Sequence, residues 1–247
     1  MNDLAGRKAL VTGGAVRVGK VLALRLASLG ADVALLTRDA SGVAADTARG
    51  IAALGVRAAV VAGDLQSAET PSRVVDEARE VLGGLDILVN NAAIFERDCL
   101  AELDLDAWSR TQRINLRAPL LLSRAFAAAL PPDREGDIIN VNDIHALRPR
   151  EGYFSYTHSK ASLHVLTRNL AAALAPRIRV NEIALGAVLP PVDPPDGYAH
   201  TNRDALPLGR FPAPDDAADA LEFLLGCRAV TGQTILIDGG EHLADIP

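Results

Sequence analysis

Apolar and polar residues follow two different periods along this chain. Short apolar runs of strand length lie at residues 8–12, 31–37, 57–62, 86–90 and 138–141. Longer stretches between them carry apolar residues three and four positions apart, as helices do, at residues 21–29, 41–54, 68–82 and 105–130. Strands that alternate with helices predict an α/β fold, with one doubly wound parallel sheet and helices on both of its faces.

The first apolar run leads into a glycine-containing turn and then into a helix that Gly30 ends. Gly13 permits the tight turn, and the N-terminus of the helix offers free N–H groups to a pyrophosphate. This strand–turn–helix unit predicts the start of a dinucleotide-binding site. From the turn we expect cofactor contacts at Gly13, Arg17, Val18 and Gly19.

The end of the second apolar run is the place where such sites select their cofactor. An acidic residue there would bind the ribose hydroxyls of NAD. Here the run ends in Thr37 and Arg38, and a neutral residue followed by a cation suits the 2′-phosphate of NADP better. Asp39 leaves alternatives open, since it can cap the next helix or pair with Arg38. Another alternative is that Arg38 is a solvated loop residue.

Small and polar residues follow the third and fourth apolar runs. Asp64 and Leu65 come after the third run, where a carboxylate and a backbone amide can meet an adenine. Asp64 is equally typical of a turn or a helix cap. Asn91 and Ala92 come after the fourth run, where small residues let the backbone approach a cofactor. Because parallel strands end at one edge of their sheet, these residues should share a site with the glycine turn.

Three side chains between residues 143 and 160 can form one proton-transfer device. Tyr156 and Lys160 are four positions apart, so a helix would place them on one face. A phenol ionises near pH ~10, and a neighbouring ammonium lowers its pKa toward the range that general acid catalysis needs. Asp143 follows the fifth apolar run, and a strand end there can bring its carboxylate beside the phenol. The alternative is an ordinary surface pair of tyrosine and lysine.

Asn115 lies inside the long fourth helical stretch, four residues before Pro119. Proline has no N–H group, so the helix cannot form its regular hydrogen bond to the Asn115 carbonyl. The sequence therefore predicts a local irregularity at which this carbonyl can hold a water molecule.

Composition narrows the class of protein. The 247 residues are 49% hydrophobic and 23% charged, with a net charge of −6, which is ordinary for a globular protein and unlike a basic nucleic-acid binder. Cys99 and Cys227 lie far apart and predict neither a disulfide framework nor a metal site. We expect no signal peptide, no membrane span and a cytoplasmic location. With no long linker or repeat, residues 1–247 should form a single domain.

Further motifs complete a pattern that runs through the chain. Its elements are Thr12-Gly13, Asp64, Asn90-Asn91-Ala92, Asn115, Tyr156-x-x-x-Lys160, Arg179-Val180-Asn181, Thr231-Gly232-Gln233 and Asp238-Gly239-Gly240. Together they resemble the short-chain dehydrogenase/reductase family over essentially the whole length. The resemblance implies a Rossmann fold, a nicotinamide cofactor and a homotetramer. It also implies Tyr156 as acid/base, Lys160 on the nicotinamide ribose, Asn115 as the holder of a relay water, and a cofactor contact at Gly186.

Two departures from the common family pattern resemble the pteridine reductases. Asp143 stands where most members have Ser, and Arg17 stands where most have Gly. Phe95 stands where those reductases have an aromatic residue, so a flat substrate could stack between Phe95 and the nicotinamide. The expected substrate contacts are therefore Arg17, Phe95, Asp143 and Tyr156.

Other positions depart from that subgroup. Ala93 stands where pteridine reductases usually have Ser, and Leu185 replaces a proline that commonly precedes Gly186. The following loop, about residues 187–206, is rich in proline and aspartate, and we expect it to be the substrate lid.

The leading hypothesis is an NADPH-dependent reductase of a pterin or a related heterocycle, with a Tyr-Lys-Asp proton relay. Burial of Asp143 beside such a substrate would raise the pKa of its carboxyl. The enzyme alternative is an NADPH-dependent carbonyl or 3-oxoacyl reductase, in which Asp143 does what serine does elsewhere. A further alternative is a non-catalytic NADP-binding regulator, because fold alone does not fix function.

Overall fold

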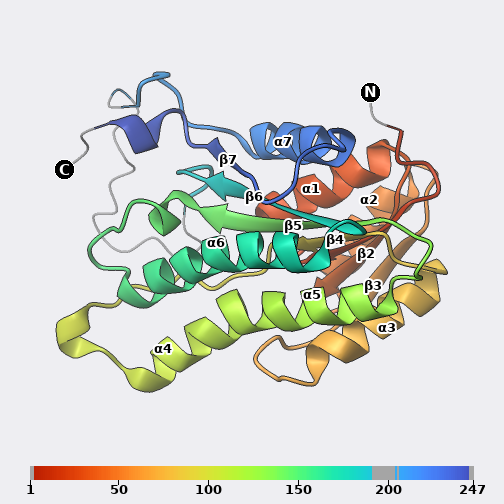
Figure 1. Cartoon of the computed structure of the whole chain (residues 1–247), viewed down its shortest axis with the longest axis horizontal. Helices are drawn as coiled ribbons and strands as arrows, with labels where there is room; N and C mark the ends of the chain where they lie inside the picture. Colours follow the sequence, from red (N-terminus) through yellow and green to blue (C-terminus); the bar gives the residue numbers. More distant parts are fainter. Residues whose placement is uncertain (1–2, 191–203, 205, 245–247) are drawn as a thin grey trace.

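A computed structural model describes residues 3–190, 204 and 206–244, and one parallel sheet of seven strands runs through them. The strands are β1 (Lys8–Thr12), β2 (Asp32–Thr37), β3 (Ala58–Ala62), β4 (Ile87–Asn90), β5 (Gly136–Asp143), β6 (Ile178–Leu185) and β7 (Thr234–Ile237). Their order across the sheet is β3-β2-β1-β4-β5-β6-β7, so the direction of winding reverses between β1 and β4 (Figure 1). The predicted doubly wound parallel sheet is confirmed.

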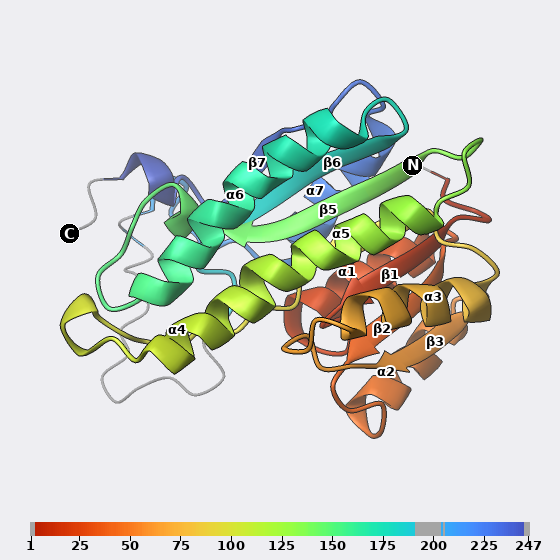
Figure 2. The same ribbon diagram turned by 60° about the horizontal axis from the view of Figure 1, so that its bottom comes forward.

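Helices cover both faces of the sheet. One face carries α1 (Arg17–Ser28), α2 (Val43–Ala52) and α7 (Pro214–Gly226). The other carries α3 (Thr70–Leu82), α5 (Ala118–Ala129) and α6 (Phe154–Leu174). Figure 2 shows α5 and α6 running beside each other across this second face, with α4 (Leu105–Gln112) leading into α5.

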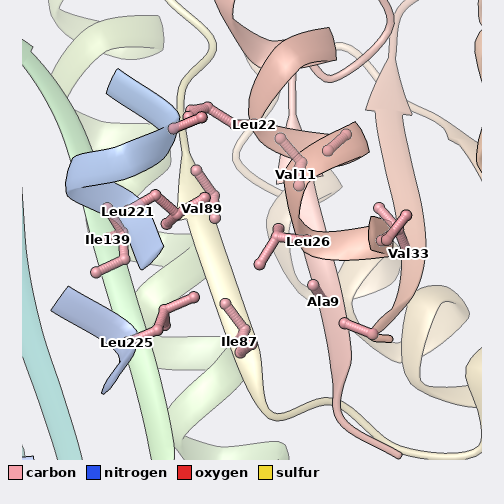
Figure 3. Packing of buried hydrophobic residues seen from close by; sticks show 14 of the residues in the cluster. Ala9, Val11, Leu22, Leu26, Val33, Ile87, Val89, Ile139, Leu221 and Leu225 are labelled. Carbon is pink, nitrogen blue, oxygen red and sulfur yellow. The ribbon is translucent and has the colours of Figure 1, made fainter. Parts of the chain in front are cut away.

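Alternate residues of the strands build two hydrophobic layers. In β1, Ala9 and Val11 belong to the layer beneath α1 and α7, whereas Leu10 belongs to the layer beneath α3 and α5. Figure 3 shows the first layer, in which side chains from both helices meet those of the central strands. Each leucine buried in this way stabilises the fold by roughly 1.5–3 kcal/mol relative to an exposed one. A residue at the end of a strand is therefore held at a fixed height by the packed residues before it.

Most predicted elements form within two or three residues of their expected bounds. The predicted helix at 105–130 is divided, because a π-helical segment, Arg113–Arg117, separates α4 from α5. β5 is longer than the apolar run that predicted it and includes Asp143 as its last residue. The periodicity did not predict α7 or β7, and only the motifs that flank β7 pointed to this region.

The edge of the sheet at which the strands begin is held by paired charges. Asp137, in β5, forms ion pairs with Arg7 at 2.7 Å and with Arg179 at 2.6 Å. Asp86, directly before β4, pairs with Arg134 at 2.7 Å. The guanidinium of Arg179 also donates to backbone carbonyls of residues 224–230, so it ties the end of α7 to the sheet.

The predicted substrate lid falls mostly outside the described residues, since 191–203 and 205 are not among them. Residues 187–190 leave β6 as an irregular segment. Within the described part of the chain, no helix is both long and apolar enough to cross a membrane.

Candidate active site

The candidate site lies where the strands end, around the reversal between β1 and β4. Asn91, just after β4, joins these two strand ends, since its side chain donates to the carbonyl of Thr12 at 2.8 Å. The hydroxyl of Thr12 accepts the backbone N–H groups of Asn91 and Ala92, both at 2.9 Å. These bonds fix the backbone at the point where a doubly wound sheet binds its ligand.

The glycine turn is shaped to approach a phosphate group. Gly13 has a φ of +62°, a conformation that favours glycine. A Cβ atom on Gly19 would lie 2.2 Å from the carbonyl oxygen of Gly13 and 2.5 Å from the side-chain nitrogen of Asn91, so no larger residue fits. Helix α1 begins without a side-chain cap and without an acidic residue in its first turn. Its first N–H groups are thus available to a pyrophosphate, and Val18 lies in the same turn.

The end of β2 presents a free cation. Arg38 is exposed, and its side chain makes no hydrogen bond or ion pair within the described part of the chain. The carboxylate of Asp39 is engaged elsewhere, since it accepts bonds from the backbone N–H and the hydroxyl of Ser41, at 2.9 and 2.7 Å. These bonds lower the pKa of Asp39. Neither alternative left open for Asp39 holds: it does not pair with Arg38, and it does not cap α2, whose N-cap is Gly42. Asp39 organises the turn between them.

The two residues after β3, Asp64 and Leu65, give less support for a cofactor contact. The carboxylate of Asp64 accepts the backbone N–H of Gln66 at 3.0 Å, which is the behaviour of a turn residue. The side chain of Leu65 is buried in the hydrophobic layer beneath α3. Adenine contacts from these two residues stay a prediction.

Tyr156 and Asp143 meet in the structure. Helix α6 begins at Phe154 and places Tyr156 in its first turn, opposite the end of β5. The phenol hydroxyl donates to Oδ2 of Asp143 at 2.9 Å. The alternative of a surface pair does not hold, because Tyr156 is 6% exposed and Lys160 is 3% exposed.

The electrostatics of this pair differ from the prediction. Burial, followed by the charge and the hydrogen bond of Asp143, raises the pKa of Tyr156 well above its usual range. The predicted lowering by Lys160 is thus wrong for this structure. Burial alone would raise the pKa of Asp143, but the hydrogen bonds and charge of His145 and the charge of Lys160 together lower it. The predicted rise of this pKa is also wrong, and Asp143 stays a carboxylate beside a protonated phenol.

Lys160 faces the end of β5. Its ammonium donates to the carbonyl of Val141 at 3.0 Å and lies 5.6 Å from the centre of the Tyr156 ring. Burial lowers the pKa of Lys160 to about 8, although the charges of Asp143 and Glu182 oppose this effect. An ammonium of this kind can lose its proton close to neutral pH.

The irregularity predicted at Asn115 is confirmed. The π-helical segment contains Asn115, and the N–H of Ala118 donates to the carbonyl of Arg113, five residues back. The Asn115 side chain bonds both backbone groups of Ile94, at 2.9 and 3.0 Å, and the hydroxyl of Ser159 at 3.1 Å. Asn115 therefore links the strand-end loop after β4 to the helix that carries Tyr156.

Aromatic rings border the Tyr156–Asp143 pair. Phe95 stacks on Tyr153 with ring centres 4.4 Å apart. It also packs edge-to-face against Tyr156, with ring centres 4.6 Å apart. Phe95 remains 40% exposed. The sequence placed this residue beside the substrate, and the structure places it beside the predicted proton donor.

Comparison with known proteins identifies the family that shares this fold and this site. A family model described as enoyl-(acyl carrier protein) reductase matches residues 14–242. The chain belongs to the short-chain dehydrogenase/reductase family. It is 34% identical to an L-rhamnose 1-dehydrogenase (NAD(P)(+)) of Sphingomonas sp. (strain SKA58), over 98% of this chain and 99% of that protein. It is 30% identical to the 3-oxoacyl-[acyl-carrier-protein] reductase FabG of Aquifex aeolicus, over 96% of this chain and 98% of that protein.

A solved structure of FolM alternative dihydrofolate reductase 1 from Brucella canis, complexed with NADP, is also similar to this chain. The TM-score is 0.90 and the identity is 37%, over 99% of this chain and 98% of that chain. Members of the short-chain dehydrogenase/reductase family are oxidoreductases that use a nicotinamide cofactor, and this protein is an enzyme of that kind.

Two of the residues predicted to contact the cofactor, Gly186 and Arg17, lie near the loop that follows β6. Gly186 directly follows β6, and its N–H donates to the carbonyl of Ile237 at 3.0 Å. Arg17 has a φ of +53°, which is unusual for a residue with a side chain and agrees with the glycine that most members have there. Its guanidinium donates to the carbonyl of Pro190. Arg17 thus spans from the glycine turn to this loop, and its predicted substrate contact stays a prediction.

Sequence reasoning missed three residues of the site. His145 contacts Asp143, and Tyr153 stacks on Phe95. Asp98 caps helix α6, since its carboxylate accepts the N–H of Ser155 at 3.0 Å. Of these three residues, only His145 could have been found from the sequence, because it lies two positions after Asp143.

Proposed function

We propose that the protein is an NADPH-dependent reductase of a pterin or a related heterocycle with a C=N bond. The hydrogen bond between Tyr156 and Asp143, beside the ring of Phe95, carries this proposal. It pairs a proton donor with a carboxylate at the edge of an aromatic surface. The resemblance to an alternative dihydrofolate reductase supports the same substrate class.

The chain has residues that fit NADPH. The turn around Gly13 and Gly19, with the start of α1, would hold the pyrophosphate, and Arg38 would meet the 2′-phosphate. Lys160 would reach the nicotinamide ribose. When bound, the cofactor supplies the hydride.

Reduction of a C=N bond adds a hydride to carbon and a proton to nitrogen, so the protein must provide the proton. Tyr156 is protonated at neutral pH because its pKa is raised by burial and by Asp143. A heterocycle with an N–H edge can donate to Asp143 and so release the phenol hydrogen toward the ring nitrogen. A ketone oxygen can only accept, so Asp143 has no such partner on a ketone. This difference favours a flat heterocycle with N–H groups.

The second candidate is a carbonyl or 3-oxoacyl reductase, which the resemblance to a 3-oxoacyl-[acyl-carrier-protein] reductase favours. Here Asp143 would only orient Tyr156. The third reading, a non-catalytic NADP-binding regulator, does not hold, because the protein is an oxidoreductase of this family, and Asn115, Tyr156 and Lys160 are all in place.

Steady-state oxidation of NADPH with dihydrobiopterin, dihydrofolate and a set of small ketones tests the proposal. We expect turnover of at least one of the two heterocycles. Asp143→Ser should lower that turnover and leave turnover of any ketone substrate nearly unchanged. Phe95→Ala should raise KM for the heterocycle about tenfold or more, because stacking on an aromatic ring contributes roughly 1–3 kcal/mol.

Phe154 offers a matched control for Phe95, since both side chains are 40% exposed and only Phe95 contacts Tyr156. Phe154→Ala should therefore leave KM for the heterocycle unchanged. Turnover of ketones alone, with full activity in Asp143→Ser, would establish the carbonyl reductase instead.

The cofactor preference has a separate test. The unmodified protein should bind NADPH more tightly than NADH, and Arg38→Asp should narrow or reverse the ratio of the two Kd values. Arg49→Asp is the control, because Arg49 is an exposed arginine of α2 that pairs with Asp46. Equal affinity for both cofactors in the unmodified protein would contradict the assignment.

The homotetramer, the cytoplasmic location and the single domain over residues 1–247 stay predictions. The described residues contain no group of three or more metal-binding side chains.

A further inference from the structure

Asp143 has a second partner besides the phenol of Tyr156. The chain turns sharply after β5 into a short 3-10 helix, Ile144–Ala146, and brings His145 back over the end of the strand. Oδ1 of Asp143 accepts the backbone N–H of His145 at 2.9 Å and also contacts the ring atom Nδ1 of the same residue. Because Oδ2 accepts the phenol at 2.9 Å, the two oxygens of this carboxylate serve two different partners.

The imidazole is enclosed by the aromatic rings of the site. Its ring centre lies 6.0 Å from those of Tyr153 and Tyr156 and 6.4 Å from that of Phe95. The side chain of His145 is 11% exposed and that of Asp143 is 18% exposed. This packing limits the movement of the imidazole, so the ring can hold the carboxylate in one orientation.

The contact also fixes the tautomer. An ionised carboxylate only accepts hydrogen bonds, so Nδ1 of His145 carries a hydrogen. The imidazole thus donates to Oδ1 of Asp143 and the phenol donates to Oδ2 of the same carboxylate.

We propose that His145 is a positioning residue, which holds the Asp143 carboxylate against the phenol of Tyr156. The inference rests on the proposed role of Asp143 beside Tyr156. The negative charge of Asp143 is one of the causes that keep the phenol proton in place, next to burial. The orientation that His145 gives to this carboxylate therefore affects proton donation by Tyr156.

Other charged and titratable groups surround the pair. Tyr156 and Lys160 face it from α6, Tyr153 from the turn before α6, and Glu241 from the short 3-10 helix Glu241–Leu243. Arg150 acts on Glu241 from the loop after the 3-10 helix at 144–146. Substitutions at His145 itself are therefore needed to assign an effect to the imidazole.

The test measures kcat with the heterocycle at neutral pH. His145→Ala should lower kcat roughly tenfold to a hundredfold, with Kd for NADPH unchanged. His145→Asn should keep most of kcat, since its amide can still donate to Oδ1 of Asp143.

A double substitution separates positioning from a general structural role. If His145 acts only through Asp143, His145→Ala should cost nothing further in an Asp143→Ala background. His158→Asn is the matched control, since His158 is exposed on α6, near Trp108. It should keep the kcat of the unmodified enzyme.

Three results would overturn the inference: a kcat for His145→Ala within about twofold of the unmodified enzyme, a loss in His145→Asn as large as that in His145→Ala, or additive losses in the double substitution. These losses are expected with a heterocycle, since turnover of a ketone should tolerate even Asp143→Ser. If no heterocycle is reduced, the inference is tested without substrate. A readout without substrate is nitrogen NMR of the imidazole, which should show hydrogen on Nδ1 of neutral His145 and a change in Asp143→Ala. Hydrogen on Nε2 alone would also overturn the inference.

Discussion

Strand β5 carries an aspartate close to each of its ends, and the two have opposite surroundings. Asp137 is 5% exposed and is held by two guanidinium groups, those of Arg7 and Arg179. Asp143 is partly buried as well, but its partners are a phenol and an imidazole, which can each gain or lose a proton. One strand thus joins a permanently paired carboxylate to one whose partners titrate.

The difference shows how to distinguish a structural charge from a functional one. Arginine stays charged at every physiological pH, so its pair with Asp137 changes only if the fold opens. The groups around Asp143 have pKa values displaced in both directions, with Tyr156 raised and Lys160 lowered to about 8. Burial occurs at both ends of the strand, and titratable partners occur at only one.

The largest effect should come from removing the proton donor at the functional end. Tyr156→Phe keeps the ring and its packing but has no hydroxyl to donate. We expect kcat to fall by roughly 10²–10⁴-fold, the usual contribution of a general acid. Titration of NADPH fluorescence should give a nearly unchanged Kd. Near-normal turnover would contradict the role of the phenol.

Substitution of Asp137, at the structural end of the strand, should lower stability and leave turnover unchanged. Asp137→Ala leaves two partly buried guanidinium groups without their carboxylate, so the free energy of unfolding should fall by roughly 3 kcal/mol. Turnover of the folded fraction should not change. The exposed Asp219, paired with Arg25, is the control, and Asp219→Ala should cost less than about 1 kcal/mol in urea denaturation. Equal losses for both substitutions would remove the contrast between the two ends of the strand.

Lys160 gives the functional end of the strand a pH-dependent effect on stability. Its pKa is about 8 in the folded protein, against an ordinary value of 10.5. Below pH 8 the lysine is charged in both states, and burial disfavours the folded one. This cost fades as the pH rises from 8 to 10.5, because the folded state then holds fewer protons than the unfolded state. Lys160→Met should accordingly be more stable by up to about 3 kcal/mol near neutral pH, and the gain should shrink at higher pH.

Urea denaturation of both proteins at about pH 7 and about pH 9.5, without added NADPH, measures this change. Lys20→Met is the control, because Lys20 is exposed on α1. Its difference from the unmodified protein should be the same at both pH values. A pH-independent gain in Lys160→Met would show that the lysine is not perturbed.

The sequence predicted those features that depend on local chemistry. The missing N–H of Pro119 predicted the break in the helix around Asn115, and the structure contains a π-helical segment there. The four-residue spacing of Tyr156 and Lys160 placed them on one helix, and the apolar run before Asp143 placed this residue at the end of a strand. Each of these inferences needs only neighbours in the chain.

The remaining features arise from contacts between distant segments. Asp98 meets the start of α6, 57 positions later, and Phe95 finds its stacking partner in Tyr153. The pKa of Tyr156 was predicted in the wrong direction for the same reason. Its spacing from Lys160 was visible, whereas the burial and the aspartate contact that outweigh this ammonium depend on the folded chain.

The order of the strands has a consequence for synthesis of the chain. β1 is central in the sheet, yet its second neighbour, β4, is synthesised only after β2 and β3. Likewise β5 lacks a partner on one side until residues 178–185 emerge as β6. Asp143, Tyr156 and Lys160 are therefore translated before the sheet that supports them is complete. A ribosome that pauses between residues 160 and 178 would expose a bare strand edge, the kind of surface on which nascent chains aggregate and chaperones act.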